Sequence, residues 1–224
     1  MYKSFYKTGI AEIPFGGDRL NKVLLELLDK NIKKGYEFKS KYTQSFDLRP
    51  DVINYDPVFV NVLKEFSIPD VIKKHTLKDM SLFHVQVRIV KNENSYMDWH
   101  RDTYYNQKGE LIGKSPHGVK IIYYPQFKDG EKDRLLYLLG SNRIIFPNNA
   151  YDNQLFNILA VKKVKTSNKK AILFDINGLH AVCPEKNKDT SIRLIYSFLS
   201  PQQIVDDHSN DMLHMSTMKM YESI

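Results

Sequence analysis

The chain has 224 residues, of which 42% are hydrophobic and 26% are charged. These proportions exclude a disordered or fibrous chain and are typical of one globular domain. The net charge of +7 is spread along the sequence, and no basic tract with interleaved aromatic residues predicts a nucleic-acid groove, so we expect a solvated basic surface.

The first 80 or so residues are predicted to be mainly helical. Apolar residues between Leu20 and Ile32 recur at helical spacing after an Asp18 N-cap, and lysines precede Gly35, so a helix is expected over residues 18–34. Further helices are expected from Asp56–Pro57 and from Pro69. Residues 1–15 and 36–55 are expected to be extended or irregular, with a short strand near residues 42–48.

From Leu82 onward the period of the apolar residues changes from helical spacing to two, which is the period of a strand. We expect eight strands, at 81–90, 96–102, 118–125, 134–139, 158–165, 170–175, 179–183 and 191–199. Three helices followed by eight strands predict a mainly β protein, a double-stranded β-helix (jelly roll, cupin-like) buttressed by helices. The whole of 1–224 is interpreted as one domain, with a helical buttress to about 80, a jelly-roll core over about 81–200 and a tail over about 201–224.

Candidate metal ligands lie in the segment Trp99-His100-Arg101-Asp102 and far downstream at His180. His100 and Asp102 are two residues apart, a spacing that points both side chains to one face of a strand. Two imidazoles and one carboxylate form a three-ligand face that suits Fe(II) and leaves positions open for other ligands. Arg193 follows on an apolar strand, where a planar guanidinium would match a carboxylate.

This order of residues, with Leu139-Gly140-Ser141-Asn142-Arg143 between the two halves, resembles the phytanoyl-CoA dioxygenase-like branch of the Fe(II)/2-oxoglutarate oxygenases. Leu139 and Asn142 stand where that family's turn has Pro and His. The resemblance implies that His100, Asp102 and His180 bind Fe(II) and that Arg193 holds 2-oxoglutarate. It also implies O2 as a cosubstrate, release of succinate and CO2, and hydroxylation of an unactivated C–H bond of a small molecule.

Three further residues are candidates for binding the cosubstrate. Ser191 lies two residues before Arg193 and so shares its face. Gln86 and Arg88 point into a cavity if the apolar face of strand 81–90 meets the helices, and into solvent in the reverse arrangement; the sequence leaves both open. For the same reason, either Tyr123 or Tyr124 points inward, but not both. The other histidines, His75, His117, His208 and His214, are interpreted as ordinary surface or loop residues.

The sequence leaves alternatives to a small-molecule dioxygenase. They are a non-catalytic or 2-oxoglutarate-independent cupin-like metal-binding protein, an oxygenase that acts on a macromolecule, and a jelly roll without metal. Arg193 argues against the first, and a small-molecule substrate is favoured because the chain has no recognisable docking domain. The long loop between about 140 and 157 is expected to be functional. Substrate identity and oligomeric state are not predicted.

One cysteine, Cys183, excludes an internal disulfide and predicts a reducing, cytoplasmic location. The first residues lack the apolar segment of a signal peptide, and no stretch approaches the length of a transmembrane helix. We therefore expect no membrane partner. Cys183 is interpreted as a small buried hydrophobe rather than a nucleophile.

Overall fold

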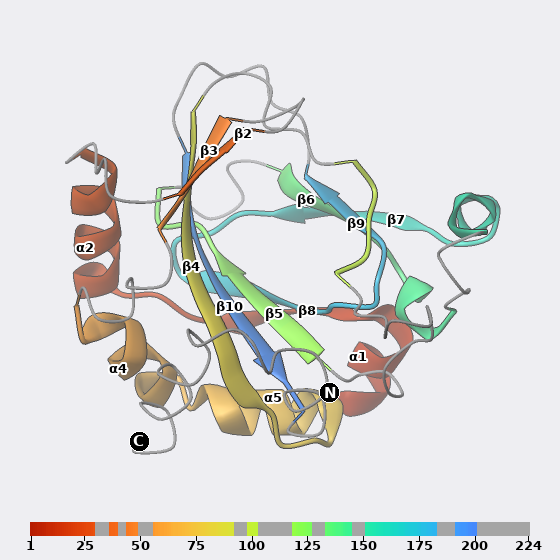
Figure 1. Cartoon of the computed structure of the whole chain (residues 1–224). Coiled ribbons are helices and arrows are strands. Elements are labelled where there is room, and N and C mark those ends of the chain that lie inside the picture. Colours follow the sequence, from red (N-terminus) through yellow and green to blue (C-terminus); the bar gives the residue numbers. More distant parts are fainter. Residues whose placement is uncertain are drawn as a thin grey trace, which may run out of the picture.

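Two antiparallel sheets face each other in the computed structural model (Figure 1). The described residues are 1–29, 36–39, 44–48, 56–91, 98–102, 118–126, 133–144, 151–182 and 191–200. The larger sheet has seven strands in the order β1-β8-β5-β10-β4-β3-β2, and the smaller has the order β7-β6-β9. The predicted mainly β architecture with helices is thereby confirmed.

The elements of the first 80 residues are α1 (Tyr2–Thr8), β1 (Ile10–Pro14), α2 (Asp18–Asp29), β2 (Tyr36–Lys39), β3 (Gln44–Leu48), α4 (Val58–Glu65) and α5 (Ile68–Thr76). The elements that follow are β4 (Ser81–Lys91), β5 (Gly118–Tyr123), β6 (Asp133–Leu138), η1 (Ser141–Arg143), η3 (Asp152–Asn157), β7 (Val161–Lys165), β8 (Lys170–Asp175), β9 (His180–Val182) and β10 (Ser191–Leu199).

One face of the larger sheet is covered by α2, α4 and α5 (Figure 1). Alternate residues of β4, β5, β8 and β10 form this face, and the core there includes Val85, Val87 and Ile121 against Leu24 and Phe59. Burial of each such side chain stabilises the fold by roughly 1.5–3 kcal/mol. Because the strand period is two, the covered apolar face leaves Gln86 and Arg88 on the inner face, which decides between the two arrangements left open above.

The same rule separates the two neighbouring tyrosines on β5 and just after it. Tyr123 packs edge-on against Phe15 on the outer face, and its hydroxyl donates hydrogen bonds to Asn21 and to the carbonyl of Asn168. Tyr124 belongs to the inner core, together with Ile122 and other residues of both sheets. Burial raises the pKa of Tyr123 to about 12.

The N-terminal region contributes more strands than the sequence predicted. β1, β2 and β3 lie in segments expected to be irregular or to hold one short strand, and they complete both edges of the larger sheet. Tertiary pairing explains this, because β1 pairs with β8 along its whole length, from Ile10 opposite Phe174 to Pro14 opposite Lys170.

Several local expectations also need adjustment. The helix expected over 18–34 is described as far as Asp29. Of the strand expected at 96–102, the described part holds a single bridge at His100. The helix expected from Asp56–Pro57 is α4, which is described from Val58 with Pro57 at its N-cap, and the Asp56 carboxylate accepts the Val58 N–H at 2.8 Å. Cys183, the whole of 103–117 with His117, and the tail from 201 with His208 and His214 lie outside the described residues.

His75 is a buried residue, and its interpretation as a surface histidine was wrong. It is 8% exposed on the last turn of α5, its Nδ1 lies 2.8 Å from the Val71 carbonyl, and its ring packs edge-on against Phe5. The reason is that α1, which the sequence pattern did not predict, packs against α5.

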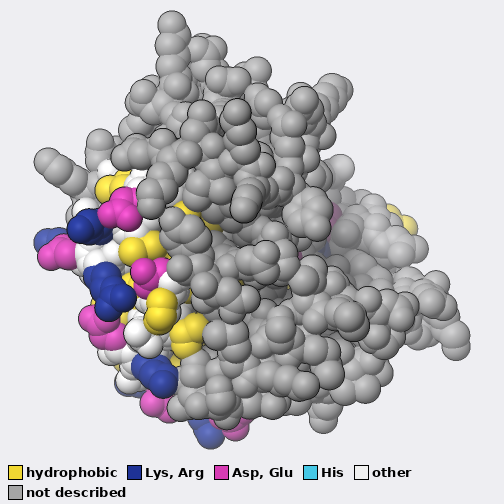
Figure 2. All heavy atoms as spheres, turned by 60° about the vertical axis from the view of Figure 1, so that its left-hand side comes forward, with side chains coloured by type: hydrophobic (Ala, Val, Ile, Leu, Met, Phe, Trp, Pro, Cys, Tyr) yellow, Lys and Arg dark blue, Asp and Glu magenta, His cyan; other side chains and the backbone are white. Residues whose placement is uncertain are grey.

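The outward surface of the helices carries charges of both signs (Figure 2). Lysines and arginines alternate there with acidic side chains, as the exposed pair of Lys73 and Asp79 illustrates with a separation of 3.0 Å. This described face therefore matches the expected solvated surface. Among the described helices, none is long and apolar enough to cross a membrane.

Candidate metal centre

The backbone brings the three predicted metal ligands together. His100 and His180 form a two-way bridge in which each N–H donates to the other's carbonyl at 3.0 Å. The Asp102 N–H donates to the Ile176 carbonyl, also at 3.0 Å. These bonds align residues almost 80 positions apart in sequence, so the spacing of two in His-x-Asp places both side chains beside the imidazole of His180.

The ligand atoms converge on one point. Nε2 of His180 lies 3.2 Å from Oδ2 of Asp102, and Nε2 of His100 lies 3.8 Å from Oδ1 of the same carboxylate. One ligand atom from each of the three residues lies within 4.8 Å of the others. Two imidazole nitrogens and one carboxylate oxygen in this arrangement could hold a metal ion, and they are a donor set that non-heme metal sites use.

Backbone carbonyls orient both imidazole rings. Nδ1 of His100 lies 2.7 Å from the Asp98 carbonyl, and Nδ1 of His180 lies 3.0 Å from the Gly178 carbonyl. Each Nδ1 therefore carries the hydrogen, and each Nε2 presents a lone pair towards Asp102. Metal-binding histidines in proteins are commonly held in this way. The convergence of lone pairs and a carboxylate on one point fits a cation.

The charge states also fit a cation. Burial, and then the nearby His180, lower the pKa of His100 to about 4, so its imidazole is neutral near pH 7. For Asp102, burial alone raises the pKa, but Lys120 and the two imidazoles outweigh it and hold the pKa well below its usual value. The site thus offers the neutral imidazole of His100 and the ionised carboxylate of Asp102.

Lys120 is a member of the site that sequence analysis missed. It lies on β5, and its Nζ is 2.8 Å from Oδ2 of Asp102. A signal was available, because Lys120 alternates with Ile122 and Tyr124 on the inner face of a predicted strand. Lys120 was not selected because the sequence contains many lysines, and composition alone does not distinguish an ammonium that points inward from one on the surface.

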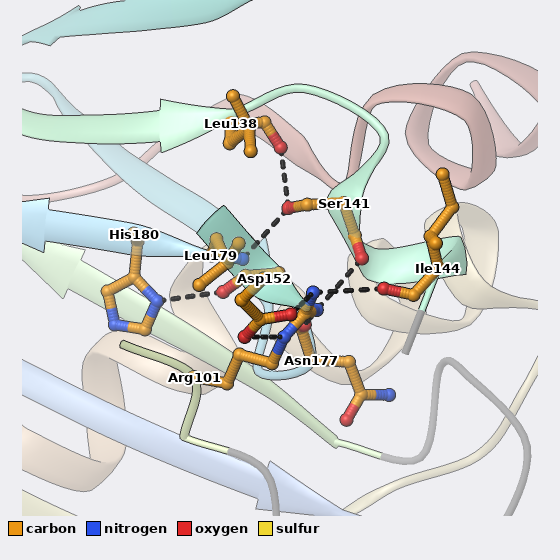
Figure 3. Close-up of polar contacts among 9 residues, drawn as sticks. Arg101, Leu138, Ser141, Ile144, Asp152, Asn177, Leu179 and His180 are labelled. Carbon is orange, nitrogen blue, oxygen red and sulfur yellow. Dashed lines mark hydrogen bonds and ion pairs between the residues drawn. The ribbon is translucent and has the colours of Figure 1, made fainter. Parts of the chain in front are cut away.

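Arg101, the residue between the two proximal ligands, points away from the cavity into a buried cluster (Figure 3). Its Nε and Nη2 donate to the two carboxylate oxygens of Asp152 at 2.9 and 2.7 Å. The same guanidinium donates to the carbonyls of Ser141, Ile144 and Asn177. Arg101 therefore fixes the metal-ligand segment to η1, to η3 and to the turn before β9.

The Gly140–Arg143 turn acts through this cluster rather than as a ligand (Figure 3). The Ser141 hydroxyl donates to the Leu138 carbonyl at 2.6 Å and accepts the Leu179 N–H at 2.8 Å, which ties the end of β6 to the residue before His180. The Asn142 side-chain amide donates to Asp175 at 3.3 Å. Asn142 thus braces the turn against the end of β8. The loop predicted to be functional supports the site through Asp152.

A cavity of about 240 Å³ opens beside the ligands, between the two sheets. Arg193 lines it, together with Gln86 and Arg88, and Arg88 lies directly opposite Arg193 on adjacent strands. Ser197, which the sequence analysis did not select, lines it too. The apolar part of the wall consists of Ile122, Leu135, Phe174, Val182 and Ile195.

Two details bear on cosubstrate binding. Ser191 begins β10 opposite Val90. The described residues of β10 that line the cavity are Arg193, Ile195 and Ser197. The side chain of Ser191 is not among the described ones. The Gln86 Nε2 is buried and has no hydrogen-bond partner among the described residues. A buried donor aimed into a cavity needs an acceptor oxygen from a ligand.

No protein-family model matches the sequence, and no curated protein matches it significantly. Solved structures do match. The non-heme α-ketoglutarate-dependent epimerase SnoN from nogalamycin biosynthesis has a TM-score of 0.68 and 10% identity over 89% of this chain and 81% of its own. HygX from Streptomyces hygroscopicus, solved with nickel, 2-oxoglutarate and hygromycin B, has a TM-score of 0.62 and 12% identity over 88% and 85%. EctD from S. alaskensis, solved with 2-oxoglutarate and 5-hydroxyectoine, has a TM-score of 0.66 and 14% identity over 90% and 75%.

The chain has the fold of these 2-oxoglutarate-dependent enzymes. The predicted jelly roll is confirmed by this similarity and by the two facing sheets. The similarity extends over 88–90% of this chain. The narrower resemblance to the phytanoyl-CoA dioxygenase-like branch stays a prediction, because identities of 10–14% do not separate branches.

Proposed function

We propose that this protein is an Fe(II)- and 2-oxoglutarate-dependent dioxygenase that hydroxylates an unactivated C–H bond of a small molecule. The observation that carries the proposal is the convergence of His100, Asp102 and His180 at one end of a cavity whose other charged residues are cations. The fold supports it as well, since neighbours of that fold were solved with 2-oxoglutarate and a metal.

Arg193 and Arg88 are proposed to bind the distal carboxylate of 2-oxoglutarate. They occupy paired positions on β10 and β4, and both line the cavity. A guanidinium presents parallel N–H donors that match the two oxygens of a carboxylate. Gln86, two residues from Arg88 and on the same face, offers its buried amide to another oxygen of the same ligand. Ser191 remains a candidate for a further hydrogen bond to it.

The protein's own residues position the reactants and exclude water. Iron bound by His100, Asp102 and His180 would supply activation of O2 coupled to decarboxylation of 2-oxoglutarate, which yields succinate and CO2. The aliphatic and aromatic wall of the cavity keeps bulk water from the reacting centre. His180 is held at 4% exposure with its ring 4.8 Å from that of Phe174, so its lone pair has a fixed direction.

The type of reaction follows from the carboxylate ligand and from the cavity. Iron halogenases of the 2-oxoglutarate-dependent superfamily have a small residue in place of the carboxylate ligand. This chain has Asp102 there, so we propose oxygenation rather than halogenation. Neighbours with this fold include the epimerase SnoN and the carbocyclase SnoK, so oxidation with a different outcome is the second candidate. A cavity of about 240 Å³ suits a small molecule.

The test is release of succinate from 2-oxoglutarate by the Fe(II)-loaded protein across a panel of metabolites. We expect stimulation by a subset of small molecules and its abolition in Asp102→Ala, with normal activity in the matched control Asp79→Ala, an exposed aspartate outside the site. Succinate release that Asp102→Ala leaves intact would contradict the proposal. Tight metal binding with no turnover of 2-oxoglutarate would favour the cupin-like alternative.

A further inference from the structure

The ammonium of Lys120 directly contacts the carboxylate of a proposed metal ligand, Asp102. Its ammonium is 2.8 Å from Oδ2 of Asp102, the same oxygen that lies 3.2 Å from Nε2 of His180. The Lys120 side chain is 22% exposed, so it is largely shielded from water. A metal ion held by Asp102 and His180 therefore shares its carboxylate with a second cation.

Two cations at such short range repel strongly in a partly buried site. The ammonium has a flexible four-carbon stem, which lets it leave Asp102 when a metal takes that carboxylate. A lysine so displaced needs another anion, because an unpaired charge in a partly buried position is costly.

The protein does not supply that second anion from the described cavity. The cross-strand partners of Lys120 are Ser197 on β10 and Phe174 on β8, and neither is acidic. Of the described residues that line the cavity, Asp102 alone carries a carboxylate. The described lining thus leaves the counter-ion to a bound ligand, at the metal end of the cavity, since Arg88 and Arg193 occupy a different part of β4 and β10.

We propose that Lys120 binds the carboxylate that the 2-oxo acid presents beside the metal. This inference rests on the proposed function and adds a residue to it. Lys120 then has two opposite effects: it competes with a metal ion for Asp102, and it stabilises the complex of metal and acid. Metal and 2-oxo acid therefore bind with positive coupling, in which each increases the affinity of the protein for the other.

Calorimetric titration tests the proposal without turnover. Ni(II) is titrated into the wild-type protein, Lys120→Met, Lys120→Gln and the control Lys73→Met, whose lysine lies on the exposed surface. The nickel-loaded proteins are then titrated with 2-oxoglutarate and with oxalate, a shorter acid that has no distal carboxylate for Arg193. Arg193→Leu is included as the comparison for the other end of the cavity.

We expect both Lys120 variants to bind Ni(II) alone about tenfold or more tightly than the wild type. They should bind 2-oxoglutarate and oxalate roughly ten- to 150-fold more weakly, the range for loss of a charge-assisted hydrogen bond. Arg193→Leu should weaken binding of 2-oxoglutarate but not of oxalate. Opposite changes in metal and acid affinity cannot come from a general loss of structure, which weakens both.

Two results overturn the role of Lys120. One is nickel affinity that is unchanged or weaker in both Lys120 variants, and the other is oxalate affinity that does not change. Failure of the proposed function has a different signature, because in that case the wild-type protein itself binds no Ni(II) or, once loaded, no 2-oxoglutarate.

Discussion

Two cationic side chains, Arg101 and Lys120, lie on opposite sides of the segment His100–Asp102, and each pairs with an aspartate in a different setting. Behind the segment, the Arg101 side chain is fully buried, makes two hydrogen bonds to Asp152 and also donates to three backbone carbonyls. In front of it, the Lys120 ammonium contacts Asp102 at the edge of the cavity. The comparison shows how the same formal charge can brace a site on one side and act within it on the other.

The difference lies in how completely each charge is satisfied by the protein. The Arg101 guanidinium has fixed, planar donors that match the acceptors around it, so any movement would break several bonds at once. Lys120 has rotatable donors and a carboxylate partner that a metal can claim. We therefore expect substitutions behind the segment to change stability, and substitutions in front of it to change binding.

The largest effect on stability is expected for Arg101→Met, which leaves Asp152 buried and unpaired. Breaking a buried ion pair costs roughly 3–5 kcal/mol, which lowers the Tm of a domain of this size by roughly 6–20 °C. Thermal unfolding followed by circular dichroism measures it. The double variant Arg101→Met, Asp152→Leu should recover part of the loss, because no charge is stranded. Equal melting temperatures for Arg101→Met and Lys120→Met would remove the distinction between the two cations.

Arg193→Leu should weaken 2-oxoglutarate binding and leave metal binding intact, since the guanidinium is proposed to hold the distal carboxylate. Loss of a charge-assisted hydrogen bond costs about 1.5–3 kcal/mol, or roughly ten- to 150-fold in affinity. Titration of 2-oxoglutarate into the Ni(II)-loaded variant measures it. A parallel loss of nickel binding would indicate that β10 has been disrupted and that the residue has no separate role.

Gly178→Ala tests whether packing behind His180, two residues further along the chain, affects metal binding. A Cβ at this position would collide with the hydroxyl of Tyr137, whose ring is fully buried and cannot move aside. Overpacking of this kind costs about 1–3 kcal/mol. We expect a lower Tm together with weaker metal binding, because the Gly178 carbonyl orients His180. A lower Tm with unchanged nickel affinity would show that the His180 ring is held by other contacts.

The smallest effect is expected for Lys73→Met, which removes an ion pair from the exposed helical surface. Its partner Asp79 is 80% exposed, so solvent screens the interaction and the change in unfolding free energy should stay within about 1 kcal/mol. The same unfolding experiment measures it. A loss as large as that of Arg101→Met would contradict the argument that burial and hydrogen bonding, rather than charge alone, separate the pairs.

Much of the fold could be predicted because the strands carry a clear period. β4, β5, β6, β8 and β10 lie within one or two residues of their predicted bounds, since alternating or continuous apolar residues mark them. β1 could not be predicted in the same way. It is five residues long and is extended because β8 pairs with it, which is a tertiary interaction.

The site residues also fall into those that the sequence predicted and those that depend on tertiary contacts. The sequence predicted that His100, Asp102 and His180 come together, because a motif with fixed spacing and one distant partner carries a chemical pattern. Gln86 and Arg88 remained ambiguous until the helices were seen to cover the opposite face. Lys120 and the Arg101–Asp152 pair were missed because each pairing joins residues that are 18 or 51 positions apart in sequence, and strand alternation alone does not name the partner of an inward charge.

The most direct test of the central claim is the visible spectrum of the Fe(II)-loaded protein when 2-oxoglutarate is added without oxygen. Chelation of the oxo acid at a metal held by His100, Asp102 and His180 predicts a weak charge-transfer band. This band should be absent from Asp102→Ala and retained in Asp79→Ala. If iron and 2-oxoglutarate both bind to the wild-type protein and no band develops, the cosubstrate does not bind at this metal and the proposed function is wrong.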